Sequence, residues 1–217
     1  MIISMLYSVS VSPIIGLVVE GESEIGAIPQ LLKDSGVRLS RPIKFGGQPE
    51  ECDDDTFREF IKREIVPCVR AMVLKNVSLI IVVIDRENRE HCPGVFAQDI
   101  AQTIVGSLES RYSYTGSPPI SVVCADRTLE NWLVADPKGI LTHNYIVKDL
   151  SSAVGANADG KDALTLLKQA FQPGRHYHKR MDAPKLACKV HATQPDVRLR
   201  SHSLDKLLRE CRVPSLH

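Results

Sequence analysis

Carboxylate side chains stand directly after two apolar segments that are typical of buried strands. Glu20 follows the run at residues 14–19, and Asp85 and Glu87 follow a second run of six apolar residues. Glu24 lies one helical turn beyond Glu20. Carboxylate oxygens bind hard divalent cations, and such cations activate water for hydrolysis. We therefore predict a Mg²⁺ or Mn²⁺ site whose ligands are Glu20, Glu24, Asp85 and Glu87.

The expected geometry of this site follows from how parallel sheets are built. The carboxyl ends of parallel strands meet at one edge, where loops and helix N-termini converge. Asp85 and Glu87 would point to the same side of an extended segment, because side chains alternate along a strand with period two. Carboxylates gathered in a low-dielectric site repel one another, so a bound divalent metal is expected there.

Some of these acidic residues also have a purely structural interpretation. Glu24 in a first helical turn would complement the helix dipole, and Asp85 at a strand end could cap the next element. The acidic residues 53–55 are expected to form a solvated loop with a capping role. The joint placement of Glu20 with Asp85 and Glu87 is harder to explain by chance, and it favours the functional interpretation.

The segments that must position these residues alternate between strand and helix patterns. β-Branched apolar runs predict strands, and apolar residues at helical spacing predict helices. Strands are expected at residues 14–19, 38–45, 79–84 and 119–124, and helices at residues 25–32, 57–72, 96–108 and 129–134. Pro29 is expected to shift the start of the first helix, and Asp55 or Thr56 is expected to cap the second. This alternation predicts an α/β fold with a mostly parallel sheet flanked by helices.

The C-terminal part of the chain differs in pattern and in charge. We predict an α/β domain at residues 1–150 and a basic, mainly helical C-terminal extension at residues 151–217 packed on it, with a small-residue linker at 151–160. Helices are expected near residues 163–171, 184–190 and 204–211. Residues 161–217 carry 12 basic and 5 acidic side chains, whereas residues 1–160 carry 15 and 21. The net charge of +7 on this tail predicts contact with a polyanion such as nucleic acid.

Composition and cysteine spacing indicate a globular protein of a reducing compartment. The chain is 43% hydrophobic and 24% charged, which excludes disorder and coiled coil. No two of the six cysteines have C-x-x-C spacing, and Cys68 and Cys124 are expected to be buried. Residues 1–19 lack the features of a signal peptide, and no apolar window is long enough to span a membrane. We expect a cytoplasmic protein with no membrane contact.

Two segments around the acidic residues resemble the Toprim domain of topoisomerases, primases, small ribosomal-RNA-maturing nucleases and the nucleases of the overcoming-lysogenization-defect family. They are Leu17-Val18-Val19-Glu20-Gly21-Glu22-Ser23-Glu24 and Ile84-Asp85-Arg86-Glu87. The resemblance implies a Toprim-like, Rossmann-like sheet with a Glu after its first strand and a D-x-D pair after its third. Glu87 stands where the second Asp usually lies, and its longer carboxylate can still bind metal.

A closer resemblance covers nearly the whole chain. The motifs that carry it are Glu130-Asn131-Trp132-Leu133-Val134-Ala135-Asp136, Tyr177-His178-Lys179 and Arg200-Ser201-His202-Ser203-Leu204. They are similar to the E-x-W-x-x-A-D, Y-x-K and R-S-x-S-F signals of the Toprim-like family catalogued as domain of unknown function forty-two seventy-six, with Leu204 in place of Phe. Members of that family are commonly encoded beside ATPases and are suspected phage-defence nucleases, which implies an AAA or ABC-type ATPase partner.

The resemblance implies functional roles for some residues of these motifs, and structural roles are the alternative. Glu130 would add a carboxylate near the metal, and Lys179 would stabilise the phosphate charge that develops in the transition state. A solvated basic loop is the alternative for Lys179. Trp132 is expected in the core, and Asp136 before Pro137 is expected to end a helix.

Two classes of function follow from these patterns. The first is a Mg²⁺- or Mn²⁺-dependent nuclease acting on DNA or RNA, with Glu20, Glu130 and Lys179 as catalytic residues. The second is a non-catalytic regulatory or effector module that docks on a partner ATPase; the chain has no G-x-x-x-x-G-K-[ST] loop of its own. A primase or ligase-like activity is less favoured, because 217 residues leave little room for nucleotidyl transfer.

Overall fold

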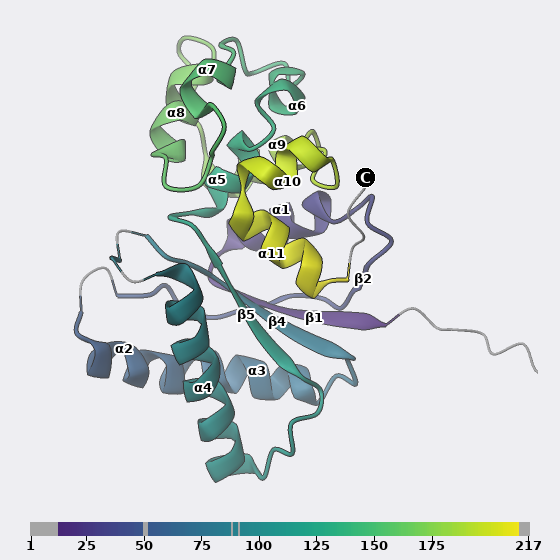
Figure 1. The fold of residues 1–217 in the computed structure, drawn as a ribbon, viewed down its shortest axis with the longest axis vertical. Coiled ribbons are helices and arrows are strands. Elements are labelled where there is room, and N and C mark those ends of the chain that lie inside the picture. Colours follow the sequence, from purple (N-terminus) through teal and green to yellow (C-terminus); the bar gives the residue numbers. More distant parts are fainter. Residues whose placement is uncertain (1–12, 50–51, 88, 91, 213–217) are drawn as a thin grey trace, which may run out of the picture.

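The computed structural model describes residues 13–49, 52–87, 89–90 and 92–212. Within them, five strands form one sheet in which every strand pairing is parallel. Strands β1 (Ile14–Val19) and β4 (Leu79–Asp85) are central and β5 (Ile120–Ala125) forms one edge, while the short strands β2 (Arg38–Leu39) and β3 (Ile43–Lys44) both pair with the other side of β1 (Figure 1). The predicted α/β fold with a mostly parallel sheet is confirmed.

Helices cover both faces of this sheet (Figure 1). One face carries α1 (Glu22–Leu31), α5 (Leu129–Val134), α9 (Lys179–Ala187) and α11 (His202–Glu210), and the opposite face carries α2 (Asp54–Phe60), a π-helical turn (Ile61–Ile65), α3 (Val66–Val73) and α4 (Pro93–Tyr112). Four shorter helices, α6 (Pro137–Leu141), α7 (Ser151–Val154), α8 (Ala163–Ala170) and α10 (Pro195–Arg200), belong to the C-terminal half.

The alternation of side chains along β4 explains why its whole sequence is apolar. Ile81 and Val83 belong to the apolar cluster on the α1 face, whereas Ile80, Val82 and Ile84 belong to the cluster on the α4 face. A parallel strand that is covered on both faces has no solvent-exposed side on which polar residues could alternate. The sheet therefore divides the protein into two apolar layers.

The basic extension shares one of these layers with the N-terminal part. Leu204, Leu207 and Leu208 of α11 lie in the same buried cluster as Leu17 of β1. Helix α9 packs so closely on α1 that a Cβ atom at Gly26 would lie 2.5 Å from Pro184 Cγ. Removing residues 161–217 would therefore expose apolar core rather than release an independent tail.

The structure corrects the second predicted strand. Residues 38–45 form two separate two-residue strands rather than one. Pro42 has no amide hydrogen and restricts Arg41 before it, which explains the interruption. The start of α1 is not shifted, because Pro29 lies near the C-terminal end of the helix and the helix begins at Glu22.

Further corrections concern helix ends and burial. The cap of α2 is Asp53, whose carboxylate accepts a hydrogen bond from the Thr56 amide at 2.7 Å, so neither Asp55 nor Thr56 is the cap. Residues 151–160 do not form a plain linker, because the first four of them form the short helix α7, whose Ser151 amide donates to Asp149 Oδ1 at 2.8 Å. Helix α9 begins five residues before the prediction, and α6 and α10 were not predicted. Cys124 is buried as expected, whereas Cys68 is only half-buried.

Residues at the two chain ends and in two loops lie outside this description. The prediction that residues 1–19 are not a signal peptide falls mostly on residues 1–12, which are outside the described residues, and residues 50–51 are outside them too. The acidic residues 53–55 are described and correct the predicted loop, because Asp53 caps α2 while Asp54 and Asp55 already belong to that helix. In the described part of the chain, no helix combines the length and the apolar character needed to cross a membrane.

Candidate active site

The fold gathers four of the predicted acidic residues at the carboxyl edge of the sheet. Glu20 directly follows β1, Glu24 lies in the first turn of α1, Asp85 ends β4, and Glu130 lies in the first turn of α5. Glu24 is 6% exposed, Asp85 9% and Glu130 1%. The acidic field of Glu24, Glu20 and Glu130 acts on the pKa of Asp85, so these side chains are close neighbours.

Glu20 is held by a residue that the sequence analysis did not single out. Gln48 donates from its backbone amide to Glu20 Oε1 at 3.2 Å and from its side-chain amide to Glu20 Oε2 at 3.4 Å. The same side-chain amide donates to the backbone carbonyl of Asp85 at 2.7 Å. Gln48 therefore joins the ends of β1 and β4. Its position just beyond β3, at the same edge of the sheet, is the signal that could have identified it.

The Asp85 carboxylate is the least compensated group of the cluster. Its carboxyl oxygens accept no hydrogen bond from any residue that the structure describes. Burial raises its pKa well above the ordinary value of 3.8, and the neighbouring charges of Glu24, Glu20 and Glu130 raise it further. Lys179 opposes this rise only in part. A cation placed here would relieve a repulsion that the protein itself leaves in place.

Burial also raises the pKa of Glu20. The hydrogen bonds from the backbone amides of Gln48 and Asp85 lower that pKa, and the charges of Glu87 and Glu24 raise it again. The net shift is upward, so the fold disfavours the ionised form of a second carboxyl in the same cluster.

Glu130 connects this cluster to the C-terminal extension. Its Oε1 accepts a hydrogen bond from the Tyr177 hydroxyl at 3.1 Å, and its Oε2 is buried with no hydrogen-bond partner. The Lys179 ammonium lies 3.6 Å from Oε2, a distance at which attraction is electrostatic. Like Gln48, Tyr177 contacts the acidic cluster but was not assigned a role there from the sequence, although it is the first residue of the Y-x-K motif.

Lys179 faces the carboxylates from the first residue of α9. Burial lowers the pKa of its ammonium group, but the negative charges of Glu130, Asp85 and Glu24 outweigh that effect and the net shift is upward. The buried Asp182 accepts a hydrogen bond from the His178 amide at 2.9 Å, which anchors the turn before Lys179. Lys179 is therefore part of a helix rather than of a loop, and its ammonium faces Glu130 while its side chain stays 46% exposed.

Glu87 departs from the predicted geometry. Strand β4 ends at Asp85, and Glu87 adopts a left-handed φ of 55° in a turn where its amide bonds to the Arg127 carbonyl at 2.8 Å. The expectation that Asp85 and Glu87 share one side of an extended segment is wrong, because the segment between them is not a strand. The charge of Glu87 still acts on Glu20, so it contributes to the acidic field.

Other motif residues have structural roles. Trp132 is fully buried, as predicted, and its indole N–H donates to Ser203 Oγ at 2.7 Å. Asp136 does not end a helix but begins one: it caps α6 by accepting from the Gly139 amide at 2.8 Å. Asp136 also accepts from the His191 backbone amide at 2.9 Å, which ties α6 to the loop before α10.

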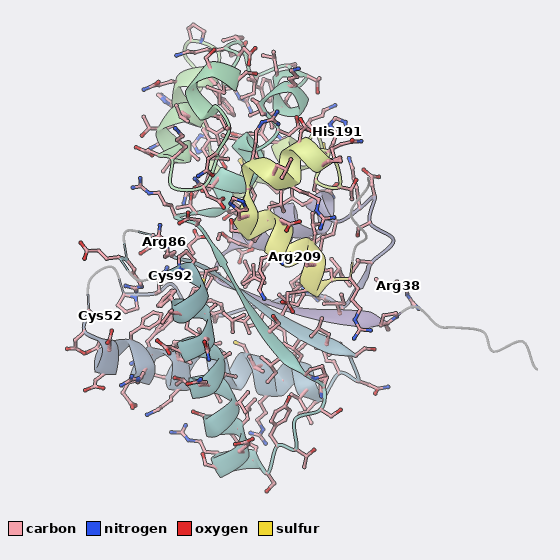
Figure 2. The ribbon with its side chains drawn as sticks, viewed as in Figure 1. Arg38, Cys52, Arg86, Cys92, His191 and Arg209 are labelled. Atoms are coloured by element: carbon pink, nitrogen blue, oxygen red, sulfur yellow. The ribbon has the colours of Figure 1, made fainter. Side chains whose placement is uncertain are left out.

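Among the described residues, six of the 12 basic side chains of residues 161–217 form ion pairs within the extension itself. Arg209, which Figure 2 labels, pairs with Asp205 one helical turn away on α11. The other pairs are Arg175–Asp182, Lys185–Asp182, Arg198–Asp205, Arg200–Asp196 and Lys206–Glu210. These pairs orient the side chains but do not reduce the net charge of +7, because that sum already counts all five acidic residues.

The arrangement is not a preformed metal cage. Among the described residues, no group of three or more His, Cys, Asp or Glu side chains is arranged so that it could hold a metal ion. Comparisons with protein-family models, curated proteins and solved structures find no match to this chain. The resemblance to the Toprim-like family therefore stays a prediction from the motifs.

Proposed function

We propose that this protein is a Mg²⁺- or Mn²⁺-dependent nuclease that hydrolyses phosphodiester bonds in nucleic acid. The observation that carries the proposal is the state of Asp85. A buried carboxylate with no hydrogen-bond donor, next to Glu20, Glu24 and Glu130, costs folding free energy unless a cation compensates it. Proteins keep such unfavourable clusters mainly at functional sites.

The donor set fits a hard divalent cation. Glu20, Glu24, Asp85 and Glu130 offer carboxylate oxygens only, which favours Mg²⁺ or Mn²⁺ over softer metals. Glu130 Oε2 is buried and accepts no hydrogen bond, although the Lys179 ammonium lies 3.6 Å away, so this oxygen can serve as a ligand atom. Because no three side chains converge as they stand, the carboxylates have to turn toward the ion, and Glu20 has to give up a long hydrogen bond to Gln48.

A bound divalent cation would lower the pKa of a water molecule and polarise a phosphate. The residues of this chain then have separable tasks. Lys179 places a positive charge beside the acidic cluster, where the phosphate gains negative charge in the transition state. Gln48 and Tyr177 hold Glu20 and Glu130 in orientation, as hydrogen bonds to metal-binding carboxylates do elsewhere.

The first experiment measures metal binding. Titration calorimetry with Mn²⁺ should show binding to the wild type and a loss of binding in Asp85→Asn, whose side chain has nearly the same shape. A variant that keeps full Mn²⁺ affinity while folded would overturn the assignment of Asp85.

The second experiment measures cleavage of single-stranded DNA, double-stranded DNA and RNA with Mn²⁺. Glu20→Gln and Lys179→Ala should each lower the rate about 100-fold or more, because Glu20→Gln removes a charged ligand of the metal and Lys179→Ala removes a positive charge beside the reacting phosphate. Lys185→Ala is the matched control: Lys185 lies on the same helix and its side chain is 47% exposed, against 46% for Lys179. Absence of cleavage by the wild type, alone and with a neighbouring ATPase, would favour the regulatory module.

A further inference from the structure

A cavity that is separate from the acidic cluster lies along the edge of β5 that pairs with no other described strand. Its volume is about 330 Å³, and it opens between the N-terminal end of α4 and the N-terminal end of α11. This size lies at the lower end of the range for small-molecule sites. The carboxylates of the acidic cluster do not line it, so it is a separate site.

The inner wall of the cavity is apolar and narrow. Val122 comes from β5, and Pro93 and Ala97 come from the first turns of α4. These small side chains leave a surface on which a planar ring can stack without displacing the core. The apolar face of any base could pack on such a surface, because apolar contact does not depend on the pattern of donors and acceptors at the edge of the base.

Polar groups with unused hydrogen-bonding capacity border this wall. Asp126 Oδ1 accepts from Arg86 Nε at 2.7 Å, while Asp126 Oδ2 accepts nothing from the described residues. Asn157 Oδ1 accepts from the Asp159 amide at 3.0 Å, which leaves its side-chain amide as a donor. One acceptor and one donor at the same cavity match the edge of a nucleobase, which presents donor and acceptor groups side by side.

The rim of the cavity carries the basic side chain of Lys206 on α11, and His202 lies beside it. Lys206 pairs with Glu210, and the carboxylates of Asp126 and Asp159 also line the cavity. The Asp159 carboxylate already accepts hydrogen bonds from Ser201 and Ser203. The cavity therefore suits an uncharged planar group with hydrogen-bonding edges rather than a phosphate.

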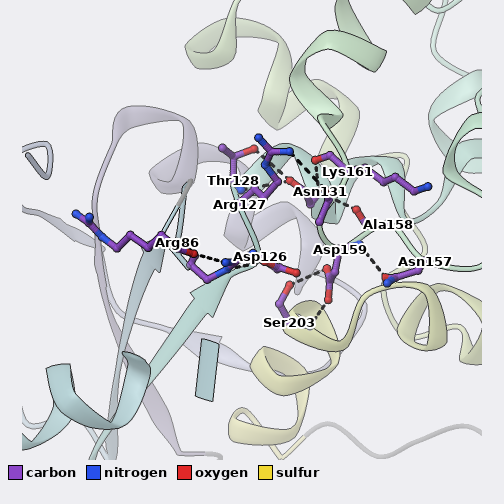
Figure 3. A network of polar contacts seen from close by, with 12 residues as sticks. Arg86, Asp126, Arg127, Thr128, Asn131, Asn157, Ala158, Asp159, Lys161 and Ser203 are labelled. Carbon is purple, nitrogen blue, oxygen red and sulfur yellow. Dashed lines mark hydrogen bonds and ion pairs between the residues drawn. The ribbon is translucent and has the colours of Figure 1, made fainter. Parts of the chain in front are cut away.

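The cavity begins one strand away from the acidic cluster. Asp85 of β4 is in register with Ala125 of β5, and Asp126 follows Ala125 directly. Neighbouring strands lie about 4.8 Å apart, which is of the order of the spacing between one nucleotide and the next. Figure 3 shows Asp126 between Arg86 and the pair formed by Asp159 and Ser203.

We propose that this cavity receives one nucleobase of the nucleic-acid strand whose phosphate lies at the acidic cluster. The inference rests on the proposed nuclease function. The cavity would position the nucleic-acid strand, because a base held beside β5 fixes which phosphate reaches Asp85. The hydrogen-bonding groups are Asp126 and Asn157, and the stacking wall is formed by Val122, Pro93 and Ala97.

The test is an abasic scan of binding, carried out with Ca²⁺ so that a hard cation is present for the acidic cluster, and a gel checks that the oligonucleotides stay uncut. Fluorescein-labelled single-stranded oligonucleotides, each with one abasic position, are titrated and followed by anisotropy. In the wild type, loss of the base that enters the cavity should weaken binding about tenfold at one position only, because its apolar contacts and hydrogen bonds are lost. A scan that is flat in the wild type would overturn the proposal.

Two variants and one control complete the experiment. Ala97→Leu fills the cavity and should make the scan flat, whereas Gln98→Leu, an exposed position on the same helix, should leave it unchanged. Asn157→Asp keeps the acceptor for the Asp159 amide but removes the donor, so it should weaken the position-specific effect even if Ala97→Leu does not fold. Retention of that effect in both variants would overturn the proposal. Failure of the nuclease function would appear separately, as absence of Mn²⁺-dependent cleavage.

Discussion

Asp85→Asn should stabilise the metal-free protein and abolish the metal binding proposed above. Asp85 is buried beside Glu20, Glu24 and Glu130, and the fold raises its pKa above 3.8 through burial first and then through these like charges. A group whose pKa is raised on folding binds protons more tightly in the folded state, so its ionised form destabilises that state. Asparagine has the same shape and carries no charge, so the substitution removes the penalty.

The magnitude and its pH dependence follow from the same shift. One pKa unit corresponds to about 1.4 kcal/mol, so we expect the free energy of unfolding to increase by about 1 kcal/mol or more at pH 8. The advantage of Asp85→Asn should shrink as the pH falls through the raised folded-state pKa, because wild-type Asp85 then takes up its proton. Below the unfolded-state value of 3.8 the difference should vanish.

Urea denaturation of both proteins at pH 8 and pH 5, each with EDTA or with Mn²⁺, measures these effects. Mn²⁺ at a free concentration 100 times its dissociation constant should stabilise the wild type by about 2.7 kcal/mol and Asp85→Asn hardly at all. The order of stability should therefore reverse when the metal is added. If Asp85→Asn is no more stable than the wild type at pH 8 in EDTA, the repulsion inferred for Asp85 is refuted.

Two further predictions concern the surroundings of the site and the cysteines. Tyr177→Phe removes the hydroxyl that donates to buried Glu130, so it should lower the free energy of unfolding, measured in urea, by about 1.5–3 kcal/mol. A double-mutant cycle with Glu130→Gln isolates the contribution of this pair. An unchanged urea midpoint would contradict the prediction. Alkylation by iodoacetamide at pH 7.5, followed by mass spectrometry, should modify Cys92 before Cys124 or Cys211. The amides of the residues at the start of α4 lower the pKa of exposed Cys92, whereas burial raises the pKa of each of the other two thiols to about 12; equal rates would refute it.

Local pattern alone determined the sheet and the placement of its acidic edge. The apolar runs before Glu20 and Asp85 are long enough to be buried strands, and each ends at a carboxylate. Once both strands are parallel neighbours, Glu20 and Asp85 must lie at the same edge, and Val19 is indeed in register with Val83. The burial of Trp132 could also be predicted from local sequence, because a large aromatic side chain in an apolar helix is usually buried.

Turn conformation was beyond the reach of these patterns. Glu87 follows Asp85 at a spacing that suits a strand, yet its backbone turns left-handed and its amide pairs with the carbonyl of Arg127. The partner of that turn comes from a segment 40 residues later in the chain, so no local rule could place it. The net charge of the basic extension likewise does not show which of its side chains pair, and only the structure shows that Asp205 forms ion pairs with both Arg198 and Arg209.

The sequence by itself indicated the candidate site residues, because carboxylates at strand ends and the E-x-W and Y-x-K motifs can be read without a structure. Only the tertiary structure decided how they are held. Gln48 reaches Glu20 across 28 residues, and Tyr177 reaches Glu130 across 47. These hydrogen bonds form because strands and helices that are distant in sequence pack on one apolar layer, and the energy of that packing depends on the whole chain rather than on any segment of it.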